Sequence, residues 1–233
     1  NTIYQEYNGC HVVDQGSAYS MLHGALGAHR DFALFTLPLI YLRPDLAREM
    51  LKFSMTSQDA ETGALPYAHI GFGKQSGAGF HASSSDLDLF FLWAVTEYLG
   101  ATRDFSLLKE EIPYSRRTSD KYVTGLEHIQ AAFIHLQQHV GNGKHGMIRC
   151  GTGDWNDALV AFSKRKLATI RRGESLLNAG LAALALPALA TLLEEQEPAF
   201  SNQLRAFAEV QATAAKRLWT GRWWARGYLG VGD

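Results

Sequence analysis

Four helical stretches alternate between two kinds of surface, and this alternation restricts the fold more than any other feature of the chain. Residues 86–99 and 175–193 are apolar nearly all round, which is typical of helices buried on most sides. Residues 124–140 and 199–218 carry their apolar side chains on a single stripe, which is typical of helices with one face in water. Buried helices that alternate with half-exposed ones predict two concentric layers, an inner and an outer ring of helices.

The rest of the chain also indicates an all-α fold. Continuous apolar strands of the kind that build a parallel sheet are absent from the sequence, so an α/β architecture is not expected. Hydrophobic residues make up 46% of the 233 positions and charged residues 19%, which suffices for one sizeable core. We therefore treat residues 1–233 as a single domain of about seven or eight helices, one of them beginning near Gly16.

Charge and cysteine usage exclude several kinds of partner. The net charge is −1, so neither nucleic acid nor an anionic membrane surface is expected to bind. Cys10 and Cys150 lie far apart without the spacing of metal ligands, which favours a reducing, cytoplasmic compartment over a disulfide framework. Residues 176–193 are long enough to span a bilayer, but Asn178 and Pro187 interrupt them. We expect a buried core helix there and no membrane partner.

Several polar residues on the helices have ordinary explanations. His128, His135 and His139 share one helix, but a metal site would need a third ligand and a motif such as His-Glu-x-x-His, which is absent. A solvated helix face is expected for them, and no metal. Asp86 and Asp88 open another helix, where capping is expected in preference to substrate contact.

Residues 151–159 are the strongest candidate for chemistry. They place two carboxylates, Asp154 and Asp157, beside the indole of Trp155 and the amide of Asn156. Sugars offer hydroxyls to planar acceptors and stack their C–H faces on aromatic rings, and a carboxylic acid held beside such a ring can protonate a glycosidic oxygen. The alternative is a loop whose acidic and amide side chains only cap a helix.

The sequence Gly-Asp-Trp-Asn-Asp at 153–157 resembles the signature of glycoside hydrolase family 94, the inverting phosphorylases of cellobiose, chitobiose and related β-glucosides. Other stretches resemble landmarks of the same family: residues 27–31, 85–93, 104–113, 173–175 and 219–226. The resemblance implies an (α/α)6 barrel, which is a double ring of helices. The present chain would supply only part of that toroid.

The resemblance also implies roles for particular residues. Asp157, the last residue of the motif, would be the general acid, and Trp155 would line the sugar site. Arg30 and Asp31 would bind hydroxyls of the glucosyl unit on the non-reducing side, and Asp154 is a further candidate of the substrate site that would orient the loop. Burial beside Trp155 would raise the pKa of Asp157 and keep it protonated. No cofactor or metal is implied, because inorganic phosphate is the co-substrate.

The expected reaction is phosphorolysis of an oligosaccharide or disaccharide with a β-linked glucosyl unit, cellobiose being the first guess. Phosphate attacks C1 from the face opposite the leaving oxygen, and the product is an α-sugar 1-phosphate. In many family members the early motif runs Arg-Asp-x-x-Gln-Asp, whereas here it runs Arg-Asp-Phe-Ala-Leu-Phe35. The second aspartate, a sugar ligand in the family, is missing, so this chain resembles a divergent branch with an altered glucosyl subsite.

Two other functions stay open. An inverting hydrolase on the same barrel would need a second carboxylate roughly 6.5–9.5 Å from the first to activate water. Asp154 is a poor candidate because it lies only three residues before Asp157, but Glu174 could serve. A non-catalytic carbohydrate-binding or structural domain is the third possibility.

The ends of the chain and its last aromatic residues complete these expectations. The chain begins with Asn1 and ends in a turn-like stretch, so we expect a piece of a longer protein that is inactive by itself; a homodimer is one expectation for its assembly. Trp219, Trp223 and Trp224 could stack on sugars, and packing in the core is the alternative.

Overall fold

The computed structural model describes residues 2–5, 9–13, 27–71, 74–76, 83–115 and 119–230. The helix expected from Gly16 lies outside these ranges. The described chain is mostly helical, with α2 (His29–Leu42), α3 (Pro44–Ser57), α4 (Leu87–Thr102), α5 (Gly125–His135), α6 (Asp157–Ala161), α7 (Lys166–Arg172), α8 (Leu176–Leu193) and α9 (Pro198–Lys216). A 3-10 helix covers Phe105–Lys109, and a π-helical turn, Leu136–Val140, continues α5.

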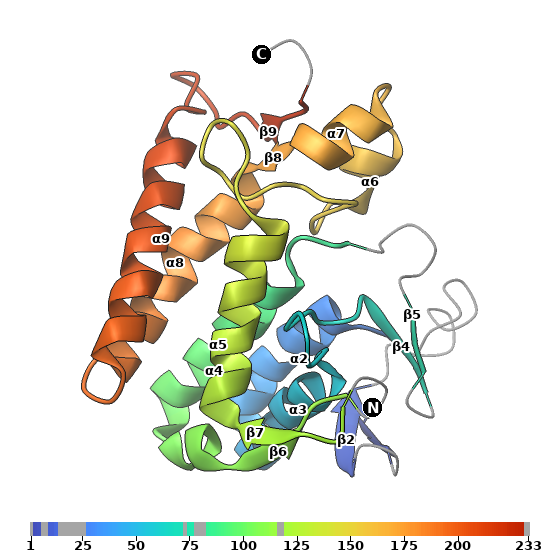
Figure 1. Ribbon diagram of the computed structural model, residues 1–233, viewed down its shortest axis with the longest axis vertical. Coiled ribbons are helices and arrows are strands. Elements are labelled where there is room, and N and C mark those ends of the chain that lie inside the picture. Colours follow the sequence, from blue (N-terminus) through green and yellow to red (C-terminus); the bar gives the residue numbers. More distant parts are fainter. Residues whose placement is uncertain are drawn as a thin grey trace.

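Short antiparallel strands connect the helices. Among the described residues they form four small sheets, made of β1 (Thr2–Gln5) with β2 (Cys10–Val13), β3 (Gly27–Ala28) with β4 (Ala68–Gly71) and β5 (Lys74–Ser76), β6 (Glu111–Pro113) with β7 (Tyr122–Thr124), and β8 (Glu174–Ser175) with β9 (Gly227–Tyr228). Figure 1 shows β8 and β9 beside α6 and α7 at one end of the helices, and β6 and β7 at the other.

The long helices form three pairs of sequence neighbours, α2 with α3, α4 with α5 and α8 with α9, and the partners of each pair contact each other. The first helices of the pairs also contact one another, because α4 packs against α2 and against α8 (Figure 1). The helices α2, α4 and α8 therefore form an inner row, and α3, α5 and α9 cover it. Two layers of helices are thus present in the described chain, and their closure into two concentric rings stays a prediction.

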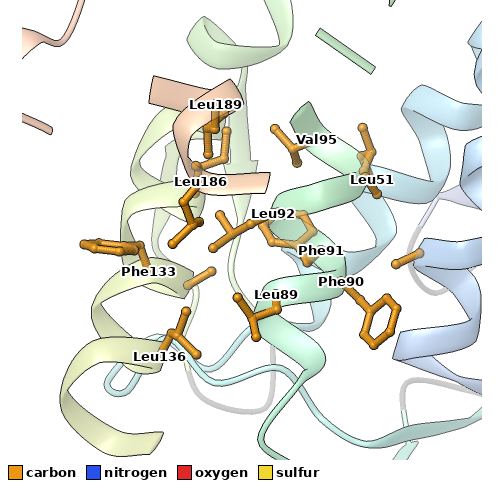
Figure 2. Packing of buried hydrophobic residues seen from close by; sticks show 14 of the residues in the cluster. Leu51, Leu89, Phe90, Phe91, Leu92, Val95, Phe133, Leu136, Leu186 and Leu189 are labelled. Carbon is orange, nitrogen blue, oxygen red and sulfur yellow. The ribbon is translucent and has the colours of Figure 1, made fainter. Parts of the chain in front are cut away.

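Helix α4 is the centre of the hydrophobic core. Its side chains Leu89, Leu92 and Val95 are fully buried. Figure 2 shows Leu89 and Leu92 directed towards Phe133 of α5 and Leu186 of α8, with α3 on the other side of the helix. Burial of each such side chain contributes about 1.5–3 kcal/mol, so α4 is the element on which the pairs of helices assemble.

The predicted boundaries of α5 are confirmed at both ends. The Thr124 hydroxyl accepts a hydrogen bond from the Glu127 backbone N–H, and the Glu127 side chain accepts one from the Thr124 N–H, which completes a capping box. At the other end Gly141 has φ +66°, a conformation that favours glycine and stops the helix.

Helix α8 differs from the prediction of burial on all sides. It is one helix of the described chain that is long and apolar enough to cross a membrane by length and composition, and 44% of it is buried. Its buried face packs on α4 and α9, whereas an apolar stripe that includes Leu184 and Ala188 stays exposed, Leu184 to 63%.

The solvated face predicted for the three histidines is wrong for His128 and His135, whereas His139, in the π-helical turn after α5, is exposed. His128 is fully buried, with Nδ1 2.7 Å from Gln58 Oε1 and Nε2 3.1 Å from the Ile112 carbonyl oxygen. His135 lies 2.6 Å from a carboxylate oxygen of the buried Asp88. The reason is that α5 packs against both α3 and α4, which buries a wider face than one stripe. In the described ranges no group of three His, Cys, Asp or Glu side chains could hold a metal ion.

Candidate active site

The inner helices α2, α4 and α8 bring their N-terminal ends together around the loop that carries the motif. Ser84, which precedes α4, forms isolated β-bridges with Gly151 and Gly153. The Ser85 hydroxyl donates to the Cys150 carbonyl oxygen at 2.8 Å and accepts a hydrogen bond from Asn178 of α8 at 2.9 Å. The loop 150–156 is therefore bound directly to the starts of the inner helices.

Gly151 is needed for this close approach. Its φ of +56° is left-handed, and a Cβ at this position would lie 2.3 Å from the carbonyl oxygen of Ser83. A side chain would push the loop away from the start of α4. Glycine at this position therefore gives the backbone the freedom that the close approach requires.

Asp154 is fully buried, and three protein groups of the described chain bind its carboxylate. Arg226 Nη2 lies 2.6 and 2.5 Å from Oδ1 and Oδ2. The Ser175 hydroxyl donates to Oδ2 at 2.5 Å, and the Asn156 backbone N–H donates to Oδ1 at 2.9 Å. Burying a charge is costly unless it is paired and hydrogen-bonded, and both conditions are met. This geometry suits a residue that orients the loop, which stays a prediction for Asp154.

Arg30 is also buried and joins α2 to the same loop. Its Nε lies 2.7 Å from Asp86 Oδ2, and its Nη2 donates to the Asp154 carbonyl oxygen at 3.1 Å. Burial raises the pKa of Asp86 to about 6, although Arg30 and the Ser84 hydroxyl favour the carboxylate. Asp31 is half-buried. The roles of Arg30 and Asp31 as ligands of sugar hydroxyls stay predictions.

The capping expected from the aspartates of α4 is wrong. Asp86 is the N-cap residue, but its side chain makes no capping hydrogen bond, because its carboxylate is engaged by Arg30 and Ser84. Asp88 pairs with His135 of α5. Both side chains connect helices instead of ending one.

The residues after Asp154 are open to solvent. Trp155 is 55% exposed, and Asn156 is exposed as well. Asp157 is the first residue of α6, which places its backbone directly after this exposed pair; its side chain lies outside the described part of the chain. The indole face of Trp155 is available to a ligand, as the predicted sugar contact requires.

Glu174, the candidate base for hydrolysis, is fully buried. One carboxylate oxygen accepts the His145 backbone N–H at 3.0 Å and lies 2.7 Å from the His145 ring, and the other accepts the Met147 backbone N–H at 2.9 Å. The carboxylate fixes the loop 143–147 onto β8, so both of its oxygens are already engaged by protein groups.

Two features near the C-terminal end bear on the site. Trp219, Trp223 and Trp224 are each about half exposed, so they do not belong to the core of the described residues.

Sequence reasoning gave no role to Arg226, although it lies in a stretch that resembles the family. Its partner Asp154 is 72 positions away, and no local pattern reports such a distant pair.

Comparison of the sequence with known proteins assigns the chain to a family. Residues 2–233 match the model of the family described as glycosyl hydrolase 94 superfamily, catalytic domain. The chain therefore belongs to this family. It is similar to a 3-O-beta-D-glucopyranosyl-beta-D-glucuronide phosphorylase of Paenibacillus borealis, with 26% identity over 146 residues, which is 62% of this chain and 18% of the relative. The match thus spans less than a fifth of the relative's length.

Proposed function

We propose that this chain is part of an inverting phosphorylase that cleaves a β-linked glucoside with inorganic phosphate. The observation that carries the proposal is the motif loop, in which a fully buried Asp154 holds the chain while the next residue, Trp155, exposes its indole. Membership of the family and the phosphorylase named above support the same reaction. Asp157 protonates the leaving oxygen, phosphate attacks C1 from the opposite face, and an α-sugar 1-phosphate results.

The three fully buried carboxylates around the loop do not suit the base of a hydrolase, which supports phosphate as the nucleophile. An inverting hydrolase needs a second carboxylate that can activate water. Among the described residues around the loop, Asp86, Asp154 and Glu174 are all buried and bound to protein partners. Phosphate brings its own negative charge and oxygen nucleophile, so this side of the site needs no base.

The substrate is expected to carry a glucosyl unit joined through a β-linkage. The relative is named for a β-glucosyl unit on a glucuronide, so a uronic acid belongs among the acceptors to be tested beside glucose. The altered motif that ends in Phe35 is a further reason to test more than cellobiose, because Phe35 stands where many family members have an aspartate that binds the sugar.

We also propose that the three pairs of helices are half of an (α/α)6 barrel. The inner row leaves apolar surface uncovered, including Leu42 of α2 and Leu184 of α8, which are 75% and 63% exposed. A groove of about 910 Å³ lies between the C-terminal halves of α2, α4 and α8. Further helices that complete the ring would cover these surfaces, so the 233-residue chain alone is expected to be inactive.

The experiment uses the full-length protein with β-linked glucobioses and glucosyl glucuronides, with and without phosphate. Free sugar and sugar 1-phosphate are measured together. The proposal requires sugar 1-phosphate only when phosphate is present, and loss of that product in Asp157→Asn. Release of free sugar without phosphate would identify a hydrolase. If no substrate is cleaved but sugars bind, the domain is non-catalytic.

A further inference from the structure

We propose that Arg226 is a positioning residue of the reaction, which acts through Asp154 on the loop that carries Trp155 and leads into Asp157. The inference rests on the proposed function, since it concerns the placement of the general acid. It adds a residue from the far end of the described chain to a site otherwise built from the starts of the inner helices.

The pair between Arg226 and Asp154 has the geometry of a strong interaction. One guanidinium nitrogen lies 2.6 and 2.5 Å from the two carboxylate oxygens, and Nη1 lies 3.3 Å from the Ser175 hydroxyl that also binds Asp154. The carboxylate is fully buried, whereas the arginine side chain is 35% exposed. Removal of one partner from a buried pair leaves an uncompensated charge, which is strongly unfavourable.

Backbone contacts on both sides of Arg226 place its side chain beside Asp154. Arg226 directly precedes β9, which pairs with β8, and its carbonyl oxygen accepts the Leu176 N–H at 3.2 Å. Gly227 has φ +156°, and a Cβ there would lie 2.1 Å from the Glu174 carbonyl oxygen. The strand therefore packs against β8 without room for a side chain, and Ser175 on β8 lies beside the same carboxylate.

The loop is bound to the rest of the protein at Asp154, and the residues directly after Asp154 are exposed to solvent. Arg30 binds the carbonyl oxygen of Asp154, Arg226 binds its carboxylate, and that carboxylate also accepts the N–H of Asn156. The next side chain, Trp155, is 55% exposed. The path of the backbone from residue 155 to residue 157 is thus set by the orientation of Asp154, and Arg226 fixes that orientation.

The consequence for the reaction is a loss of rate more than a loss of binding. Misplacement of a catalytic group by about 1 Å can cost about 10²-fold in rate. We expect Arg226→Ala to lower kcat by about 10²-fold, with KM for phosphate and for the sugar changed by less than about 3-fold. Arg226→Lys keeps one cationic nitrogen for the Asp154 carboxylate but loses the contact that Nη1 makes with the Ser175 hydroxyl, so it should recover part of the activity.

The test is a double-mutant cycle in the full-length protein. Arg226→Ala, Asp154→Ala and the double variant are compared by kcat and both KM values, after circular dichroism shows that each is folded at the assay temperature. If Arg226 acts through Asp154, the double variant loses no more rate than the more impaired single variant, and added guanidinium restores part of the rate to Arg226→Ala only while Asp154 is present. Arg205→Ala is the matched control, because Arg205 also pairs with a carboxylate, that of Glu194, but on the surface and away from the loop.

Two results would overturn the inference. Additive losses in the double variant would show that Arg226 acts independently of Asp154. A rise in KM for phosphate with unchanged kcat in Arg226→Ala would make it a substrate ligand. Failure of the proposed function is a separate outcome, because the product formed by the wild-type protein reveals it. The double-mutant cycle can then still be measured on the cleavage reaction that the wild type does perform.

Discussion

Nε of Arg30 lies 2.7 Å from Oδ2 of Asp86, and this buried ion pair joins the first turn of α2 to the start of α4. The same guanidinium reaches the Asp154 carbonyl oxygen at 3.1 Å, so one side chain links two inner helices to the motif loop. The pair therefore stabilises the arrangement of the site, independently of any contact that Arg30 makes with a sugar.

The first prediction concerns this pair. Arg30→Met leaves the Asp86 carboxylate buried without its cation, so the free energy of unfolding should fall by about 3–5 kcal/mol. Urea denaturation followed by circular dichroism measures it. The exposed pair of Arg205 and Glu194 provides the control, because Arg205→Ala should cost no more than about 1 kcal/mol. Equal losses in both variants would contradict the importance of the buried pair.

The second prediction concerns pH. Burial, with a smaller contribution from His69, lowers the pKa of His29 to about 3. Neither of its ring nitrogens has a hydrogen-bond partner in the described structure. His29 of the unfolded chain takes up a proton near pH 6.5, whereas His29 of the folded chain does not. The contribution of neutral His29 to the free energy of unfolding is therefore complete above pH 6.5 and is lost as the pH falls towards 3. At pH 5 the loss is about 2 kcal/mol.

His29→Phe should remove this pH dependence and keep the packing. His29 stacks on Phe53 with an interplanar angle of 3°, and a phenyl ring can make the same contact. The loss of unfolding free energy between pH 7 and pH 5 should then be smaller by about 2 kcal/mol than in the wild type. His139→Phe, at an exposed position of the π-helical turn that continues α5, serves as the control. An unchanged slope in His29→Phe would show that this imidazole does not titrate as described.

The third prediction concerns the glycine before the motif. Gly151→Ala forces a Cβ against the Ser83 carbonyl oxygen in a left-handed conformation, so the free energy of unfolding should fall by about 1–3 kcal/mol, and the rate should fall because the loop shifts. Gly180→Ala is the matched control. A Cβ at Gly180 meets nothing within 4 Å, and alanine within a helix should stabilise by about 0.5–1 kcal/mol.

The fourth prediction concerns the 233-residue chain expressed alone. The exposed apolar stripe of α8 and the exposed end of α2 should make it associate, so size-exclusion chromatography with light scattering should detect oligomers or aggregates. Leu184→Gln, which makes the stripe more polar, should reduce the association. A wild-type chain that is monomeric and unfolds cooperatively would contradict the half-barrel proposed above.

Helix positions and the motif loop could be predicted because their signals are local. The capping box at Thr124 and the stop at Gly141 depend on a few neighbouring residues. The apolar run of α4 directly reports its burial. The family resemblance likewise began from five consecutive residues and was extended by short stretches elsewhere in the chain, and the match over residues 2–233 confirmed it.

The features that sequence reasoning missed depend on packing between distant segments. Asp86 looks like a capping residue until Arg30, 56 positions away, takes its carboxylate. His128 looks solvated until α3 brings Gln58 to its ring. The exposed stripe of α8 follows the same rule, because an apolar sequence shows that a helix can be buried but not which neighbours cover it.

The most direct test of the central claim is the anomeric form of the product. The full-length protein is incubated with its β-linked glucoside and inorganic phosphate, and the sugar phosphate is identified by proton and phosphorus NMR. The account predicts an α-sugar 1-phosphate that forms only with phosphate and does not form with Asp157→Asn. A β-sugar 1-phosphate, or free sugar released at the same rate without phosphate, would contradict inverting phosphorolysis.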